Sequence, residues 1–467
     1  MILLVYYGVV FLSVGLFSVA LIFLKKPFTR FAYATTGLLN IMLDRSLNED
    51  DKQVIMIKKL SALLKGFSIF LLLLSFSCML AIFPVILYLF IEETSVQDVD
   101  TRSFKFYVAM LLGSLILFVI PSKDKGKDYN EWTKLLHRMI LDNYNISRGL
   151  FNFEKKVFRR RIKDKRKNFV IVTGLARGGT TALTNLLYES QHFYSLSYSN
   201  MPFILSVNLW SKIYSPRKNK LKERAHKDNI KFGYKSIEAL EEYFYKAQLN
   251  DSFIEESTLV KHDISQKTYE DYISYQLLVG LNSSNSVYLA KNNNLILRYR
   301  SIRSYNKDFH ILLMLRHPVE HAKSLVKQHL KFSERHEEDP FSLEYMNWLG
   351  HHEFGLNHKP FKLDADHNLN FPIGSLDYWV SSWVEYYSYV LQFVIEDRNL
   401  HIIDYSDLCS KPDRILQFAC GLFDLALGDI EITPYRPTQS TIEEIDTHLL
   451  EESERVYREL LSHKVHL

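Results

Sequence analysis

The stretch "NFVIVTGLARGGTTALTNLL", residues 168–187, decides the fold. It runs from β-branched apolar residues through a glycine-rich turn into a helical pattern. Its spacing fits the phosphate-loop frame G-x-x-x-x-G-K-[ST], with Thr181 as the final hydroxyl. Thr180 stands where the frame requires the lysine that contacts the β and γ phosphates, and the cation in the loop is Arg177. The sequence therefore predicts an anion site that differs from that of a nucleoside triphosphatase.

Downstream of this stretch, apolar strand-like runs alternate with helical patterns, which is the order of βαβ units around a parallel sheet. The buried run "HILLMLR" ends in Arg316, where a phosphate-loop triphosphatase has an Asp that helps to hold Mg²⁺. An arginine there repels a metal and binds an anion. A nucleotide with an additional phosphate explains both departures, since one anion can rest on the loop and helix N-terminus and the other on Arg316. We expect an α/β fold over residues 168–467, a phosphate-loop-type parallel sheet flanked by helices, with no metal.

Three motifs follow one another in residues 168–425: "GLARGGTTALTNLL", "VYLAKNNNLILRYRSI" and "LRHPVEHAKS". In this order they resemble the sulfotransferase family, and most closely its membrane-associated carbohydrate branch. The first resembles the family's 5′-phosphosulfate loop. The second is similar to the segment that supplies a lysine near the transferring group, here Lys291. The third resembles the 3′-phosphate motif, with Arg316 and Ser324 in its fixed positions.

The resemblance implies that the donor is 3′-phosphoadenosine 5′-phosphosulfate. The loop would hold the 5′ phosphosulfate, and Arg316 and Ser324 would hold the 3′ phosphate. Lys291 would neutralise charge on the bridging oxygen in an in-line transfer, to which the protein contributes position and charge. The implied donor-binding residues are Arg177, Gly178, Gly179, Thr180, Thr181, Arg316 and Ser324.

The acceptor must lose a proton, which requires a general base. The sulfotransferase family uses a His or a Glu at differing places, so the resemblance does not choose one. We expect His226, or one of Glu241 and Glu242 in the helical segment "SIEALEEYFYKAQL", where an acceptor cleft should form. Adjacent residues are about 100° apart on a helix, so at most one of the two glutamates points into the site. The His-rich stretch 350–372 has no ordered ligand spacing and is interpreted as a loop.

The first 121 residues contain three apolar runs, which predict transmembrane helices at residues 1–24, 66–90 and 106–120. The first two exceed the roughly 20 residues that a helix needs to cross a bilayer, whereas the third is shorter. Lys and Arg collect between the first two runs and directly after the third, and the loop "IEETSVQDVDTR" is acidic. The positive-inside rule then places the N-terminus outside and the residues after 121 in the cytoplasm. Residues 122–167 are expected to form a basic, helical juxtamembrane linker, whose cationic cluster "KKVFRRRIKDKRK" at residues 155–167 lies on anionic headgroups.

Composition excludes several classes of protein. A chain of 467 residues has room for a large domain and additional segments. The apolar content of 47% excludes a disordered chain, and the net charge of +4 is too small to imply a nucleic-acid partner. Three cysteines argue against a disulfide framework and fit a reducing compartment.

These observations predict a multi-pass enzyme of a bacterial inner membrane with a cytoplasmic catalytic domain. The expected acceptor is a hydroxyl or an amine of a carbohydrate or lipid-linked glycan at the membrane, and polysaccharide biosynthesis proteins are possible partners. Two alternatives stay open. A catalytically silent sulfotransferase-like scaffold of a polysaccharide assembly complex would bind the nucleotide weakly. A phosphate-loop kinase or ATPase would require Mg²⁺.

Overall fold

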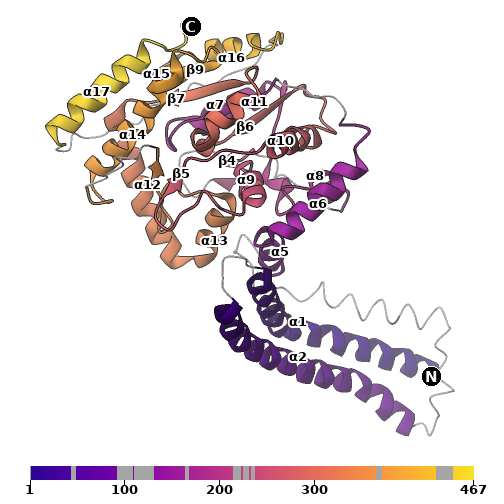
Figure 1. Cartoon of the computed structure of the whole chain (residues 1–467). Helices are drawn as coiled ribbons and strands as arrows, with labels where there is room; N and C mark the ends of the chain where they lie inside the picture. Colours follow the sequence, from indigo (N-terminus) through magenta and orange to yellow (C-terminus); the bar gives the residue numbers. More distant parts are fainter. Residues whose placement is uncertain are drawn as a thin grey trace. The chain divides into compact units, whose positions relative to one another are not determined.

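A computed structural model of the chain describes residues 2–43, 49–91, 109, 131–162, 168–213, 222–223, 231–232, 237–363, 371–427 and 445–467. The chain divides into two compact units, Met1–Asn143 and Tyr144–Leu467. Figure 1 shows that the described part of the first unit is helical, whereas the second combines a sheet with helices.

The helices of the first unit are α1 (Ile2–Leu43), α2 (Glu49–Ile91) and α5 (Glu131–Leu141). α1 and α2 run antiparallel. Tyr6 near the start of α1 packs against Tyr88 near the end of α2, with ring centroids 5.9 Å apart, and Phe31 packs against Phe67 at 5.2 Å. The closed end of this hairpin therefore carries the basic segment between the first two apolar runs.

Two predicted transmembrane segments lie inside these helices. One described helix is long and apolar enough to cross a membrane, Ile55–Ile91 in α2, and it contains the predicted span 66–90. A shorter apolar helix, Val5–Ala20, lies within the predicted span 1–24. Both predicted spans are thus helical.

The first helix is longer than predicted. It has 42 residues and passes through Pro27 without ending, whereas the predicted span stops at residue 24. At about 1.5 Å per residue it exceeds the roughly 30 Å hydrocarbon core of a bilayer. The predicted third span, 106–120, lies outside the described residues apart from Ala109.

The second unit begins with α6 (Tyr144–Val157), inside the segment 122–167 that was expected to be a linker. The buried Glu154 carboxylate accepts hydrogen bonds from the backbone N–H groups of Asn208 and Leu209, at 3.1 and 2.9 Å. Three N–H donors, including the Asn208 amide at 2.8 Å, satisfy this carboxylate. α6 is therefore part of the α/β unit, and the end of the predicted linker lies outside the described residues.

The core of the second unit is a five-stranded sheet in the order β2-β6-β1-β7-β9, in which all neighbouring strands are parallel. The strands are β1 (Val170–Thr173), β2 (Phe193–Tyr194), β6 (Val287–Lys291), β7 (His310–Leu315) and β9 (Leu400–Asp404). β1 is central and buried. The chain reaches β2 and β6 on one side of β1 and β7 on the other, and such a reversal places ligands at the carboxyl ends of the strands. The predicted parallel α/β sheet is confirmed.

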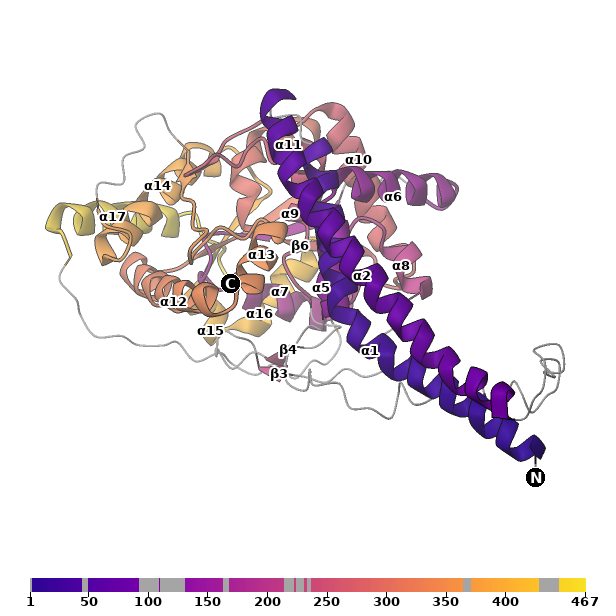
Figure 2. The same ribbon diagram turned by 90° about the horizontal axis from the view of Figure 1, so that it is seen from below.

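Helices cover both faces of the sheet (Figures 1 and 2). Val170 and Val172 of β1 pack with apolar residues of α7 (Thr180–Glu189) and α16 (Pro412–Gly421). The opposite face packs against η3 (Asn293–Arg298), α11 (Tyr299–Tyr305) and α14 (Leu376–Val394). Because side chains alternate along a strand, this two-sided burial explains the nearly continuous apolar sequence of β1 and β7.

Smaller elements surround this core. β3 pairs antiparallel with β4, and β5 pairs parallel with β8. The remaining described elements are η2 (Tyr198–Asn200), α8 (Val207–Ile213), β3 (Lys222–Glu223), β4 (Lys231–Phe232), α9 (Glu242–Leu249), β5 (Leu259–Val260), α10 (Gln266–Val279), α12 (Pro318–Glu338), α13 (Pro340–Leu349), β8 (Phe361–Lys362), α15 (Tyr405–Ser410) and α17 (Thr447–Leu461).

Candidate active site

The loop between β1 and α7 lies at the carboxyl end of the central strand. Gly174 and Gly179 have φ angles of +134° and +102°, which L side chains rarely adopt. A Cβ atom on Gly179 would lie 2.7 Å from Cδ2 of Tyr405, so the loop closes against α15. The first N–H groups of α7 have no partner within the helix, and they and the helix dipole favour an anion at this point.

Arg316 follows β7 directly and forms one side of the site. It is 9% exposed, and its Nη1 donates to the carbonyl oxygen of Arg177 at 3.1 Å. Its guanidinium lies 4.7 Å from the ring centroid of Tyr405. Burial lowers the pKa of Arg316 from its usual value. Arg177 in turn donates through Nε to Oγ of Ser324 on α12, at 3.3 Å. These contacts bring the predicted 3′-phosphate residues to the loop.

Lys291, the last residue of β6, forms the other side of the site. Its Nζ donates to Oγ1 of Thr181 at 3.0 Å and lies 3.3 Å from Oε1 of Glu238. Thr181 is the hydroxyl residue of the phosphate-loop frame. A neighbouring strand therefore supplies the ammonium group that the loop lacks at Thr180.

His321 on α12 supports the loop from beneath. Its Nε2 contacts the carbonyl oxygen of Ala176 at 2.8 Å, and the side chain is completely buried. Because Nε2 donates to a carbonyl, the neutral imidazole carries its lone pair on Nδ1. Burial, reinforced by the neighbouring Arg316, lowers the pKa of His321 to about 3. A neutral ring suits this position because a second cation would oppose Arg316.

All the predicted donor-binding residues therefore lie in one continuous region. Gly178 and Gly179 belong to the same loop as Arg177, and Thr180 and Thr181 are the first residues of α7. The contacts above join the loop and this helix start to both neighbouring strands. Their role in donor binding stays a prediction.

The predicted general bases have different positions. His226 lies outside the described residues. Glu241 is 2% exposed, and its carboxylate accepts hydrogen bonds from Tyr272, Tyr288 and Asn292 at 2.7–3.0 Å. Burial raises the pKa of Glu241. Glu241 therefore belongs to a buried hydrogen-bond network. These surroundings do not favour its predicted role as general base, which stays a prediction.

Glu242 is also buried. Both of its carboxylate oxygens accept hydrogen bonds from Arg298, each at 2.6 Å, and the Arg298 guanidinium stacks 4.1 Å from the Tyr245 ring centroid. Removing one partner of a buried ion pair of this kind strongly destabilises a protein. These contacts give Glu242 a structural role, and they do not favour its predicted role as general base.

Sequence reasoning missed Glu238, the carboxylate beside Lys291. It accepts a hydrogen bond from the Tyr198 hydroxyl at 2.6 Å and from the backbone N–H of Ala239 at 3.0 Å. The expected helix over "SIEALEEYFYKAQL" begins only at Glu242, so Glu238 lies in irregular chain before α9. Helical periodicity was therefore the wrong guide to which glutamate reaches the site.

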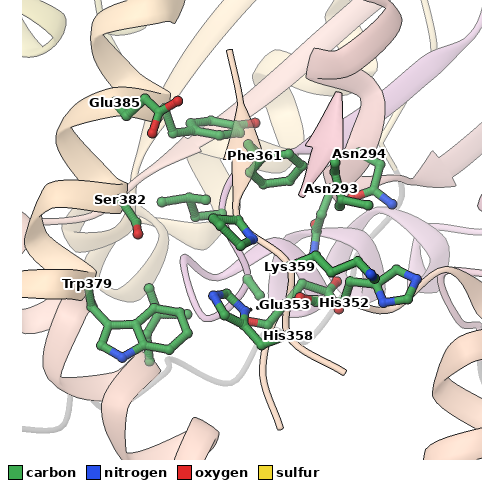
Figure 3. Close-up of a pocket in the computed structure, with 16 residues that line it drawn as sticks. Asn293, Asn294, His352, Glu353, His358, Lys359, Phe361, Trp379, Ser382 and Glu385 are labelled. Carbon is green, nitrogen blue, oxygen red and sulfur yellow. Dashed lines mark hydrogen bonds between the residues drawn. The ribbon is translucent and has the colours of Figure 1, made fainter. Parts of the chain in front are cut away.

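A pocket adjoins the loop at Leu175 and Ala176 and has a volume of about 560 Å³, including its opening to solvent. Figure 3 shows Trp379, Ser382 and Glu385 of α14 on one side of this pocket and Asn293 and Asn294 across from them. Eight of the sixteen lining residues are apolar or aromatic and eight are polar or charged, so the pocket offers a small molecule both apolar walls and hydrogen-bonding groups. The full lining is Leu175, Ala176, Leu259, Asn293, Asn294, Leu325, His352, Glu353, His358, Lys359, Pro360, Phe361, Trp379, Ser382, Glu385 and Tyr386.

No family model and no curated protein sequence matches this chain. Among solved structures, it is similar to sulfotransferase STF1 from Mycobacterium tuberculosis H37Rv, at 14% identity over 73% of this chain and 85% of that chain, with a TM-score of 0.38. It is also similar to sulfotransferase STF9 from Mycobacterium avium, at 13% identity over 76% and 82%, with a TM-score of 0.39. A sulfotransferase from Alicyclobacillus acidocaldarius matches at 13% identity over 64% and 98%, with a TM-score of 0.34. These structures are of the family that the sequence motifs resemble.

Proposed function

We propose that this protein transfers a sulfuryl group from 3′-phosphoadenosine 5′-phosphosulfate to a hydroxyl of a carbohydrate or lipid-linked glycan at a membrane. The observation that carries the proposal is the pair of cations on opposite sides of the loop. Lys291 lies beside Thr181, and Arg316 is linked to Ser324 through Arg177. Two separate cationic positions suit a donor that carries anions at two separate positions.

Each cation has its own part in this proposal. The N–H groups at the start of α7 and the Thr181 hydroxyl hold the 5′ phosphosulfate. Arg316 and Ser324 bind the 3′ phosphate, because a guanidinium can make a bidentate contact with it. Lys291 stabilises the charge that develops on the oxygen between phosphorus and sulfur as that bond breaks. Positioning supplies the rest, since sulfuryl transfer resembles phosphoryl transfer in its loose transition state.

The pocket of Figure 3 is the proposed acceptor site. It borders the loop at Ala176, and Trp379 and Phe361 offer aromatic faces on which the apolar face of a sugar ring can stack. Ser382 and Glu385 add polar groups for the ring hydroxyls. Such a mixture of flat apolar walls and polar groups fixes the orientation of a ligand.

The proposal includes a membrane location. The closed end of the α1–α2 hairpin carries the basic residues that the positive-inside rule assigns to the cytoplasm. With three spans in a bacterial inner membrane, the α/β unit would also lie in the cytoplasm, where the donor is made. A reporter fused after Leu467 tests this topology: a cytoplasmic reporter such as a fluorescent protein should be active there, whereas activity of a periplasmic phosphatase fusion would contradict it.

Calorimetry tests the donor. The full-length protein in detergent is titrated with adenosine 3′,5′-bisphosphate and with ADP, each with and without Mg²⁺. The full chain is used because the α/β unit already begins at Tyr144, so a truncation after that residue would remove α6. Metal-independent binding of the bisphosphate, in clear preference to ADP, is expected. Metal-dependent ADP binding would instead favour the kinase alternative, and binding of neither would favour the scaffold.

A further inference from the structure

The loop that follows α13 carries a histidine and carboxylate pair to which the proposed function assigns no role. Nδ1 of His351 lies 3.3 Å from Oε1 of Glu353. Asn293 donates through Nδ2 to the same Glu353 oxygen at 3.1 Å, and Asn294 donates to the carbonyl of the residue before His351 at 3.1 Å. His351 is therefore held between two hydrogen bonds to the residues that follow Lys291 in the chain.

This loop is also fixed from its other side. The backbone N–H of His351 donates to the carbonyl of Met346 at 3.0 Å, and its own carbonyl accepts from Nδ2 of Asn357 at 2.9 Å. His358 contacts the carbonyl of Glu353 through Nδ1 at 2.8 Å. The described residues contain no cluster of three or more His, Cys, Asp or Glu that could hold a metal. The His-rich loop thus positions the pair through backbone contacts, as a catalytic group requires.

Charged groups from three elements act on His351: Glu353 on its own loop, Glu238 before α9 and Lys291 at the end of β6. Burial lowers the pKa of His351, but the two carboxylates outweigh burial and Lys291, so the pKa is raised above its usual value. Burial raises the pKa of Glu353, but His351 and its hydrogen bond lower that pKa to about 2. The pair is therefore oriented by charge as well as by hydrogen bonds.

We infer that His351 is the general base that takes the proton of the acceptor hydroxyl, and that Glu353 is its positioning residue. The inference rests on the proposed sulfuryl transfer. Nδ1 donates to Glu353, so the lone pair lies on Nε2, which no hydrogen bond occupies among the described residues. The His351 side chain is 16% exposed, and the neighbouring His352 and Glu353 line the proposed acceptor pocket.

Nε2 of His351 takes the hydroxyl proton while the hydroxyl oxygen forms a bond to sulfur. The bond between sulfur and the bridging oxygen breaks, and its electron pair leaves on the 5′ phosphate of adenosine 3′,5′-bisphosphate, beside Lys291. The imidazolium then returns its proton to solvent.

The decisive variant is His351→Gln in the full-length protein, with His448→Gln, an exposed histidine of α17, as the matched control. Formation of adenosine 3′,5′-bisphosphate from the donor is measured with octyl β-glucoside present, so that transfer to this sugar and transfer to water are both counted. We expect His351→Gln to bind the bisphosphate within about twofold of the original protein and to lose at least about 100-fold in turnover, the range of general-base catalysis. Turnover within threefold of the original would overturn the inference.

The pH profile separates a base from a structural histidine. The unprotonated ring is active, so the rate should rise with pH through an apparent pKa above the usual histidine value. Glu353→Gln removes the carboxylate that raises this pKa, so the rising limb should move to lower pH. In His351→Gln the limb should vanish. A limb that persists there but vanishes in Glu238→Gln would assign the base to Glu238 instead.

An acceptor-independent readout is carbethoxylation of His351, followed by peptide mass spectrometry. The reagent attacks neutral imidazole, so the negative bisphosphate, by holding a proton on a nearby ring, should slow the modification of His351 and leave His448 unchanged. An equal rate with and without bound bisphosphate would overturn the inference. Failure of the original protein to bind the bisphosphate would be a different result, since it would remove the proposed function itself.

Discussion

The two strands that flank β1 bring cations to the loop in different electrostatic settings. Lys291 on the β6 side has the Glu238 carboxylate 3.3 Å away, so its charge is largely compensated. Arg316 on the β7 side has no carboxylate within ion-pair distance among the described residues, and its contacts are a carbonyl and the Tyr405 ring. A buried cation without a counter-ion is costly. We infer that the β7 side is built to bind an external anion, and that the β6 side is built to respond when charge changes during the reaction.

Substituting Lys291 should have the largest effect. In Lys291→Ala, kcat for sulfate transfer should fall about 10²–10³-fold, the cost of removing one group that stabilises developing charge. Affinity for adenosine 3′,5′-bisphosphate should change only a few-fold, because Lys291 acts on the transferring end. Fixed-time assays with labelled donor measure kcat, and calorimetry measures the affinity for the bisphosphate. A loss confined to affinity would reverse the roles given to the two sides.

Arg316→Ala tests the other side. We expect bisphosphate binding to weaken about 100-fold, because a desolvated charge contact worth roughly 2–3 kcal/mol is lost. Binding of ADP, which lacks the 3′ phosphate, should stay within about twofold. Arg316→Lys retains the charge but loses the bidentate geometry and the stacking on Tyr405. Its affinity for the bisphosphate should therefore lie between that of the original protein and that of Arg316→Ala.

The ratio of the two affinities is the decisive quantity for Arg316. Retained ADP binding shows that the variant is folded. Equal weakening of both nucleotides would contradict a 3′-phosphate role and leave the uncompensated charge of Arg316 unexplained.

The sequence predicted one side of this comparison better than the other. β1, β7 and Arg316 were predictable because a strand buried on both faces reads as an uninterrupted apolar run, and the residue after such a run lies at the ligand-binding edge. Lys291 was found only through the family resemblance. Glu238 was not found, because it lies in irregular chain that no periodicity marks.

His351 illustrates the same limit. It lies in a loop whose position depends on Asn293 and Asn294, far away in the sequence. No local pattern encodes these long-range side-chain contacts. The predicted bases Glu241 and Glu242 had a suitable residue type in a suitable region, but tertiary partners bury them. Residue type alone therefore did not distinguish a buried structural carboxylate from a general base.

His321 connects the β7 side to stability. Its pKa is about 3 in the folded protein and about 6.5 when unfolded. The folded value is the lower one, so His321 stabilises the fold fully above pH 6.5, and this contribution is lost as pH falls from 6.5 towards 3. The loss is about 1.4 kcal/mol per pH unit in that window, or about 2 kcal/mol at pH 5.

The variant His321→Gln cannot take up this proton. We expect it to be less stable than the original protein at pH 7.5. Because only the original protein loses stability through this proton as the pH falls, the difference between their unfolding midpoints should shrink at pH 5. His448→Gln, at an exposed position, is the control and should show no such narrowing. A difference that is constant between the two pH values would mean that His321 is not held neutral beside Arg316.

Ser324→Ala should have the smallest effect and sharpens the comparison most. The Ser324 hydroxyl accepts from Nε of Arg177, so removing it loses one hydrogen bond on the β7 side and leaves Arg316 in place. We expect bisphosphate affinity to fall about 5–10-fold, which corresponds to about 1–1.4 kcal/mol. ADP affinity and kcat should be nearly unchanged. Ser333→Ala, on the same helix with its hydroxyl bonded to the His329 carbonyl, should leave all three quantities unchanged. If Ser324→Ala lowered kcat instead, the β7 side would take part in the transfer step, and the division between a binding side and a reacting side would not hold.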